Sequence, residues 1–230
     1  MDRTLQFNQP WILQRADPYV YRHTDGKYYF TASLPEYDGI ALRCSDTLAG
    51  LRDAEEVRIW NKHESGIMSC HIWAPELHYL DGAWYIYYAG GDKDDIWEIR
   101  PYVLECKDAD PMTGTWVEKG LVERSADDAF SFTDFSLDAT VFENKGKRYF
   151  VWAEKVSVGQ KISNLYIAEM ETPLKLKTAQ VLLSTPCYDW ERIGFWERRT
   201  VRAEEERQDL PDLFCQRDRR RLLCGNAHRG

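Results

Sequence analysis

The sequence lacks the long apolar stretches that membrane-spanning segments require. No segment approaches the roughly 20 consecutive apolar residues of a transmembrane helix. The first eleven residues, MDRTLQFNQPW, contain no apolar core of signal-peptide length. The sequence therefore predicts a protein that contacts no membrane and stays in the cytoplasm.

The sequence also lacks an excess of positive charge and a cysteine spacing that would indicate a metal site. The formal net charge is −8 at pH 7, which argues against nucleic acid as the partner of the main part of the chain. None of the six cysteines stands at metal-ligand spacing from another, and Cys44 and Cys106 fall at matching points of two repeats. We expect reduced, mostly buried thiols, no metal site and no cofactor.

What the sequence does contain is a threefold repeat of two strands joined by a glycine turn. The copies are DPYVYRHTDGKYYFTAS (17–33), APELHYLDGAWYIYYAG (74–90) and DATVFENKGKRYFVWAE (138–154). Each copy has the alternation and turn chemistry of a β-hairpin. A second pair of predicted strands follows each hairpin, within residues 40–60, 100–120 and 164–184.

Four strands in a repeat of about 60 residues are typical of the blades of a β-propeller. We therefore predict an all-β fold, with four-stranded blades at about 17–60, 74–120 and 138–184, in a domain that covers residues 1–196. The alternative is a β-sandwich with coincidental hairpins. The recurrence of both halves of the repeat disfavours it.

Residues 197–230 differ in kind from the rest of the chain. They hold nine of the 19 arginines and none of the 11 lysines, and the apolar alternation stops after Trp196. Three interpretations compete: a basic binding tail, a solvated helix, or translation in the wrong frame. With synonymous codons chosen for the purpose, a shifted frame encodes Asn-Glu-Gly-Pro and then an Asn-Gly-Lys turn, which makes a fourth hairpin on the same period. We favour a frameshift near Trp196, with a disordered, out-of-frame tail.

The acidic motifs of the repeats are RADPYVY (15–21), IWAPELHY (72–79), FSLDATVF (135–142) and then the Asn-Glu-Gly-Pro of the shifted frame. As a set in this order, they resemble the motifs of glycoside hydrolase family 43. The resemblance covers residues from about 8 to 196. It implies a five-bladed β-propeller, of which about three blades are present here. It also implies an α-L-arabinofuranosidase or β-xylosidase type of glycosidase, acting on arabinose- or xylose-containing oligosaccharides.

The resemblance also implies catalytic roles. Asp17 would be the general base that activates water, and Asp138 the carboxylate that orients the general acid and modulates its pKa. Inverting hydrolysis needs an acid and a base on opposite faces of the sugar. The acid would be the glutamate of the Asn-Glu-Gly motif, which is absent from this frame and is not assigned to Glu197.

Each catalytic candidate has a structural alternative. Asp17 precedes Pro18, and Asp-Pro is a common turn or strand start. Asp138 fits the cap of a turn, and Asp134 lies nearby as a competing candidate. The repeat favours Asp17 and Asp138, because they occupy the same position in their copies, where the second copy has Ala74.

Three residues of the second blade are predicted to contact the substrate. His71 and Trp73 are expected at its rim as sugar-contacting residues, although a core position suits Trp73 almost as well. Glu76 stands at the acidic position of the family motif, in a structural or substrate-positioning role. Some family members hold a cation at the propeller axis, with ligands expected mainly in the part that is missing here.

Without the general acid and the last blades, we expect this chain to be unstable, to aggregate and to hydrolyse little or nothing, because an open propeller exposes sheet edges. Two other functions stay open. One is a non-catalytic carbohydrate-binding propeller. The other is a protein-interaction propeller whose basic tail binds an acidic partner.

Overall fold

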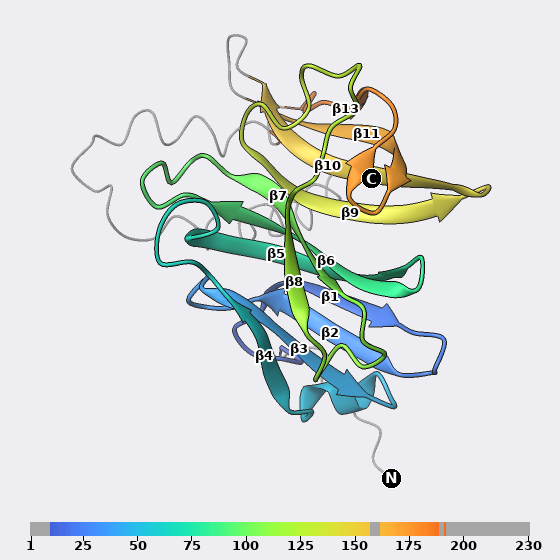
Figure 1. Cartoon of the computed structure of the whole chain (residues 1–230). Coiled ribbons are helices and arrows are strands. Elements are labelled where there is room, and N and C mark those ends of the chain that lie inside the picture. The colour runs from blue at the N-terminus through green and yellow to red at the C-terminus, as the bar shows by residue number, and fades with distance from the viewer. Residues whose placement is uncertain (1–9, 157–161, 189–190, 192–230) are drawn as a thin grey trace, which may run out of the picture.

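The computed structural model describes residues 10–156, 162–188 and 191, and these form three antiparallel sheets stacked face to face (Figure 1). The first sheet contains β1 (Ala16–Arg22), β2 (Tyr28–Ser33), β3 (Gly39–Ser45) and β4 (Glu56–Asn61) in that order. The second contains β5 (Cys70–Leu80), β6 (Ala83–Gly91), β7 (Arg100–Cys106) and β8 (Trp116–Leu121). The third contains β9 (Ser136–Asn144), β10 (Lys147–Val156) and β11 (Ile162–Thr172), with β12 (Lys175–Leu176) and β13 (Val181–Ser184) both paired to β11.

This arrangement confirms the predicted all-β propeller of four-stranded blades. The one helix that lies entirely within the described residues is a short 3-10 turn, η1 (Ala49–Arg52). The third blade departs from the prediction, because two short strands share its outer position. The reason is a second partner for β12: Lys175 bridges to Glu123, and the Leu176 N–H donates to the carbonyl of Glu123 at 2.8 Å.

Two of the predicted hairpin turns are the tight two-residue kind. Asp81 and Gly82 have φ values of 51° and 83°, and Lys145 and Gly146 have values of 51° and 74°. A turn of this kind needs positive φ at both central residues. A Cβ added to Gly82 would meet nothing within 4 Å, so space does not explain the glycine. The positive φ of the backbone does, because glycine adopts it without steric cost.

The middle sheet is buried on both faces, and this fixes its position between its neighbours. Along β6, Trp84, Ile86 and Tyr88 belong to the core shared with the first sheet, whereas Tyr85 and Tyr87 belong to the core shared with the third. Alternate side chains of a strand point to opposite faces, which explains this division. As a result, the innermost strands β1, β5 and β9 lie side by side.

The four described cysteines are free thiols, as predicted, but they are less buried than expected. Cys44 is the last but one residue of β3 and Cys106 the last residue of β7. Cys106 is buried and Cys44 and Cys70 are half-buried, but Cys187 lies beyond the last strand and is exposed. Within the described part of the chain, no helix is long and apolar enough to cross a membrane, and no His, Cys, Asp or Glu cluster could hold a metal ion.

The arginine-rich tail at 197–230 lies outside the described residues. The hypothesis that it is out of frame therefore stays a prediction.

Candidate active site

Each innermost strand contains a β-bulge near its start. In every case one extra residue is inserted relative to the hairpin partner: in β1 between Ala16 and Tyr19, in β5 between Trp73 and Glu76, and in β9 between Leu137 and Thr140. A bulge bends the strand and re-aims the side chain of the extra residue, and bulges are enriched beside active sites. The three blades thus repeat a local distortion as well as a strand pattern.

The first residue of each bulge has a left-handed backbone. The φ values are 50° at Asp17, 45° at Ala74 and 51° at Asp138. A residue other than glycine pays on the order of 1–3 kcal/mol for such a conformation, which persists only where the surrounding structure imposes it. The structure therefore places Asp17, Ala74 and Asp138 at one equivalent position of the three blades.

Carboxylates from all three blades interact electrostatically near these bulges. Desolvation by the surrounding protein, followed by the negative charges of Asp17 and Glu76, raises the pKa of Asp138 to about 7. The Asp138 residue is nevertheless exposed to solvent, so water screens part of this effect. Asp138 is therefore surrounded by protein atoms but accessible to water, and it does not belong to the hydrophobic core.

The raised pKa of Asp138 predicts a pH-dependent stability. A carboxyl whose pKa is higher in the folded protein than in the unfolded chain stabilises the fold fully below about pH 4, and this contribution is lost as the pH rises through about 7. Asp138→Asn carries no charge to repel. Relative to the wild type, its free energy of unfolding should therefore rise by about 1–2 kcal/mol between about pH 5 and about pH 8, a value reduced for solvent access.

Urea unfolding at both pH values measures this difference. Asp127→Asn, which changes an exposed loop carboxylate, is the matched control for the loss of one negative charge. An Asp138→Asn difference that is the same at both pH values would contradict the prediction.

Ser33 connects the first two bulges, and the sequence analysis missed it. Its buried hydroxyl donates to Asp17 Oδ2 at 2.8 Å and accepts the backbone N–H of Ala74 at 2.8 Å. The hydroxyl thereby fixes the orientation of the Asp17 carboxylate against the second blade. An alignment of the three repeat copies offered a signal for Ser33: it is the last residue of its copy, and the corresponding residues are Gly90 and the site residue Glu154.

Glu154 organises the loop that leads into β9. Its buried carboxylate accepts four N–H groups at 2.8–3.1 Å, from the backbone of residues 132–134 and from the indole of Trp152. The competing candidate Asp134 belongs to this loop. Its own carboxylate accepts the backbone N–H of Phe135, and it is not among the groups that raise the pKa of Asp138. For Asp138, in contrast, burial and then an electrostatic interaction with Asp17 raise the pKa.

Glu76 faces a buried histidine two residues along its strand. Its Oε2 lies 3.1 Å from Nε2 of His78, and the His78 ring lies 5.3 Å from that of Tyr19. Burial, and then the charge of Glu76, raises the pKa of Tyr19. Sequence reasoning missed His78 and Tyr19. His78 stands two residues from Glu76 in a regular part of β5 and therefore on the same strand face, whereas the bulge at Asp17 removes that signal for Tyr19.

His71 and Trp73 lie together at the start of β5. Their ring centres are 4.4 Å apart, and Nδ1 of His71 lies 3.0 Å from the carbonyl oxygen of Ile96. Burial lowers the pKa of His71, so its ring is neutral near pH 7. Trp73 is half-buried and belongs to none of the core clusters. Both residues are thus placed at the end of the sheets where the bulges begin.

The fold and these residues define a β-propeller with an acidic centre, flanked by aromatic side chains, where its innermost strands meet. The sequence profile of the glycosyl hydrolases family 43 matches residues 7–201. The chain belongs to this family.

Individual relatives agree with this assignment. An extracellular exo-α-(1→5)-L-arabinofuranosidase of Streptomyces chartreusis is 48% identical over 193 residues, which is 84% of this chain and 57% of the relative. A protein of the same name from Streptomyces avermitilis is 45% identical over 84% of this chain and 39% of the relative. The crystal structure of an α-L-arabinofuranosidase from Lactobacillus brevis superposes with a TM-score of 0.71 at 48% identity, covering 79% of this chain and 57% of that one.

Two further facts come from these comparisons. The chain spans about half the length of the curated relatives that it matches. Both Streptomyces relatives are named extracellular, which contradicts the predicted cytoplasmic location. That prediction was wrong because it relied on the absence of an apolar stretch in the first eleven residues, and such an absence does not fix a location.

Proposed function

We propose that this chain supplies the general base and its neighbouring carboxylates to an α-L-arabinofuranosidase that inverts the configuration at the anomeric carbon. The observation that supports the proposal is the convergence of three carboxylates in a family 43 chain: Asp17 and Asp138 stand at matched bulge positions, and Glu76 lies two residues beyond the matched Ala74. Hydrolysis of a glycosidic bond needs carboxyl groups in different protonation states on opposite faces of the sugar.

Asp17 is the general base in this proposal. The Ser33 hydroxyl donates to Oδ2 of Asp17 and so orients the carboxylate, which takes a proton from the attacking water. Asp138 is the modulating carboxylate. With a pKa of about 7, it changes charge near neutral pH and so alters the field on a neighbouring acid.

Glu76, His71 and Trp73 position the sugar. Glu76 accepts hydrogen bonds from sugar hydroxyls while His78 orients its carboxylate. The Trp73 ring offers an apolar face to the sugar, since aromatic rings pack against C–H surfaces. His71, neutral and hydrogen-bonded to the backbone, packs against the Trp73 ring and so fixes its orientation.

The general acid comes from a part of the protein that the present reading frame does not encode. The family match ends at residue 201, close to Trp196, where we place the frameshift. The relatives extend well beyond the part that this chain covers. Both facts support the proposal that residues 1–196 are the first three blades of a longer hydrolase.

The substrate linkage is arabinofuranosyl rather than xylosyl, as the names of the similar arabinofuranosidases suggest. We expect the 230-residue chain to bind methyl α-L-arabinofuranoside at least about tenfold more tightly than methyl β-D-xylopyranoside, a difference of about 1.4 kcal/mol. Titration followed by ligand-observed NMR measures both affinities at low protein concentration. Trp73→Ala should weaken arabinoside binding.

Other results of this titration point to other functions. Equal binding of the two glycosides would contradict the arabinofuranosyl assignment. Binding of neither glycoside would favour the protein-interaction propeller, and arabinoside binding by a completed chain that hydrolyses nothing would favour the non-catalytic carbohydrate-binding propeller.

A further inference from the structure

One position of the repeat faces the next blade along the chain in each of the first two blades. When the repeat copies are aligned at their turn glycines, Tyr29, Tyr85 and Tyr149 correspond. Tyr29 is 4% exposed in the core between the first and second blades, and Tyr85 is 6% exposed in the core between the second and third. Tyr149 is only half-buried and lies outside the core clusters of the described residues. The third blade therefore presents a face of the kind that the first two blades bury.

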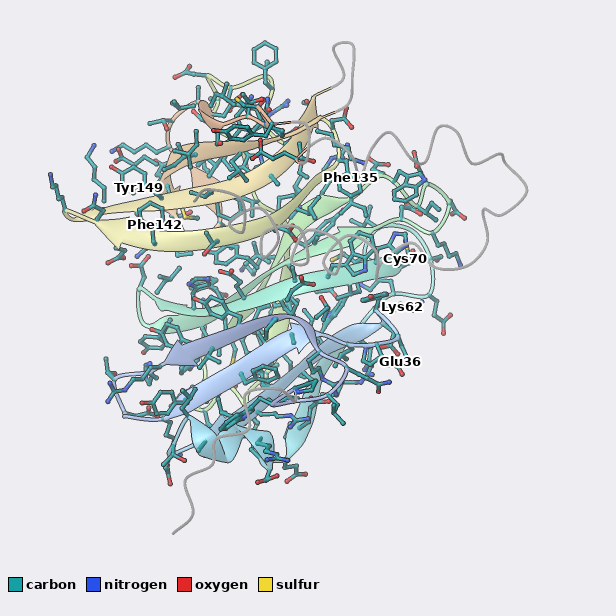
Figure 2. The ribbon with its side chains drawn as sticks, turned by 180° about the vertical axis from the view of Figure 1, so that it is seen from behind. Glu36, Lys62, Cys70, Phe135, Phe142 and Tyr149 are labelled. Carbon is teal, nitrogen blue, oxygen red and sulfur yellow. The ribbon has the colours of Figure 1, made fainter. Side chains whose placement is uncertain are left out.

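This face of the third blade lies at one end of the stack of sheets (Figure 1). Tyr149 stands opposite Phe142 of β9, and Figure 2 shows the two rings together, with centres 5.4 Å apart. Directly opposite residues of an antiparallel pair share a face, and so do residues two apart along a strand. The face therefore continues over β10, β11 and β13. We call its six apolar side chains the open face: Phe142, Tyr149, Val151, Leu165, Ile167 and Val181.

The open face is accessible and carries no charge of its own. Its most exposed members, at 42–61%, are Leu165, Phe142 and Val181. Glu169 borders it and is neutralised by Lys147 at 2.8 Å and by Lys177 at 2.7 Å. An apolar patch with a polar border is typical of a surface that binds another protein.

The surface that matches the open face is the opposite face of another blade. In the two interfaces that are present, the following blade contributes Ile86 and Phe150, which correspond in the repeat and are fully buried. A second copy of this chain does not offer this surface. The corresponding residue of its first blade, Phe30, is only 5% exposed, because Ile12 and Leu51 already cover it. The open face thus fits a further blade that this chain does not contain.

Contacts between the blades do not depend on the segments that connect them. The Tyr87 hydroxyl donates to the Pro173 carbonyl at 2.7 Å, and Arg148 donates to both carboxylate oxygens of Asp81 at 2.8 Å. These partners are 86 and 67 residues apart in the chain. A connecting segment adds an effective concentration, of mM order for a short flexible linker, and no contact. Blades can therefore pair as separate molecules at sufficient concentration.

We propose that the open face docks a separate polypeptide that carries the remaining blades, so that two chains form one hydrolase without a covalent link. This inference rests on the proposed function and extends it, because a partner molecule supplies the general acid. The chain covers 57% of the Streptomyces chartreusis relative, and the uncovered remainder of that relative is the kind of partner to which the proposal commits.

The experiment produces two separate polypeptides together in one cell. One is the 230-residue chain with an affinity tag, and the other is the untagged segment of the Streptomyces chartreusis relative that follows its matched region. The segment should copurify with the tagged chain. The complex should hydrolyse 4-nitrophenyl α-L-arabinofuranoside at least about 10²-fold faster than the 230-residue chain alone, because a positioned general acid contributes roughly 10²–10⁴-fold.

Leu165→Asp places a carboxylate in the open face. Burial of an unpaired charge is strongly unfavourable, so copurification and hydrolysis should both fall by at least about tenfold. Val117→Asp is the matched control, because Val117 is 50% exposed on β8 of the second blade, outside the open face. It should dock and hydrolyse as the unsubstituted chain does. Without the partner, both variants should unfold at the temperature of the unsubstituted chain, because both positions are exposed.

A covalent fusion of residues 1–196 to the same segment separates the two proposals. If the fusion is active but the separate chains do not copurify, or copurify without gaining activity, docking between separate chains is overturned and the proposed function stands. If Leu165→Asp docks as the unsubstituted chain does, or Val117→Asp docks as poorly as Leu165→Asp, the assignment of the open face is overturned. If the fusion itself hydrolyses nothing, the proposed function fails and this inference fails with it.

Discussion

Completion of the propeller is expected to raise the hydrolysis of 4-nitrophenyl α-L-arabinofuranoside by at least about 10³-fold over the 230-residue chain. The completed chain joins residues 1–196 to the segment of the Streptomyces chartreusis relative that follows its matched region. A positioned general acid alone accelerates such reactions by roughly 10²–10⁴-fold. Closure of the ring also removes exposed sheet edges and orders the innermost strands.

Release of 4-nitrophenol measures both rates. The control is a completed chain in which the glutamate of the family Asn-Glu-Gly motif is replaced by glutamine, and it should be as slow as the 230-residue chain. If the 230-residue chain is itself as fast as the completed one, its own residues include the general acid and the account is contradicted.

In the completed chain, Asp17→Asn should lower kcat by about 10³-fold or more while changing KM little. The amide keeps the hydrogen bond from Ser33 but cannot take a proton from water, so the attacking nucleophile is lost and binding is retained. Steady-state kinetics on the same arabinofuranoside give both constants.

Asp134→Asn is the matched control for this prediction, because Asp134 lies in the loop that leads into β9 and is not placed in the catalytic machinery. Its kcat should stay within about twofold of the unsubstituted completed chain, in line with the small effect of most surface changes. If the Asp134 variant were the inactive one, the roles of Asp134 and Asp138 would have to be exchanged.

The hairpins and blades could be predicted because their signals are local. Alternation with period 2 and the Gly82 and Gly146 turns are readable within some 17 residues of sequence. The outer position of the third blade could not be predicted. The division between β12 and β13 depends on a backbone contact with Glu123, which lies 52 residues before Lys175 in the chain.

The sequence allowed us to predict which residues occupy equivalent positions in the site, but not the backbone geometry at those positions. The repeat indicated that Asp17, Ala74 and Asp138 are equivalent, but nothing in Asp-Pro, Ala-Pro or Asp-Ala specifies a left-handed bulge. The bulge is imposed by pairing with the neighbouring strand. Contacts between blades, such as the one that Ser33 makes with Ala74, depend on tertiary packing in the same way.

The most direct test of the central claim is to determine the coding DNA from the codon of Trp196 through about 400 bases past the present stop codon. The claim is that residues 1–196 are the first three blades of a family 43 arabinofuranosidase whose general acid is encoded in another frame. It predicts a second reading frame that continues with an Asn-Glu-Gly strand and further blade repeats. A genuine arginine-rich reading frame with no such continuation would contradict it.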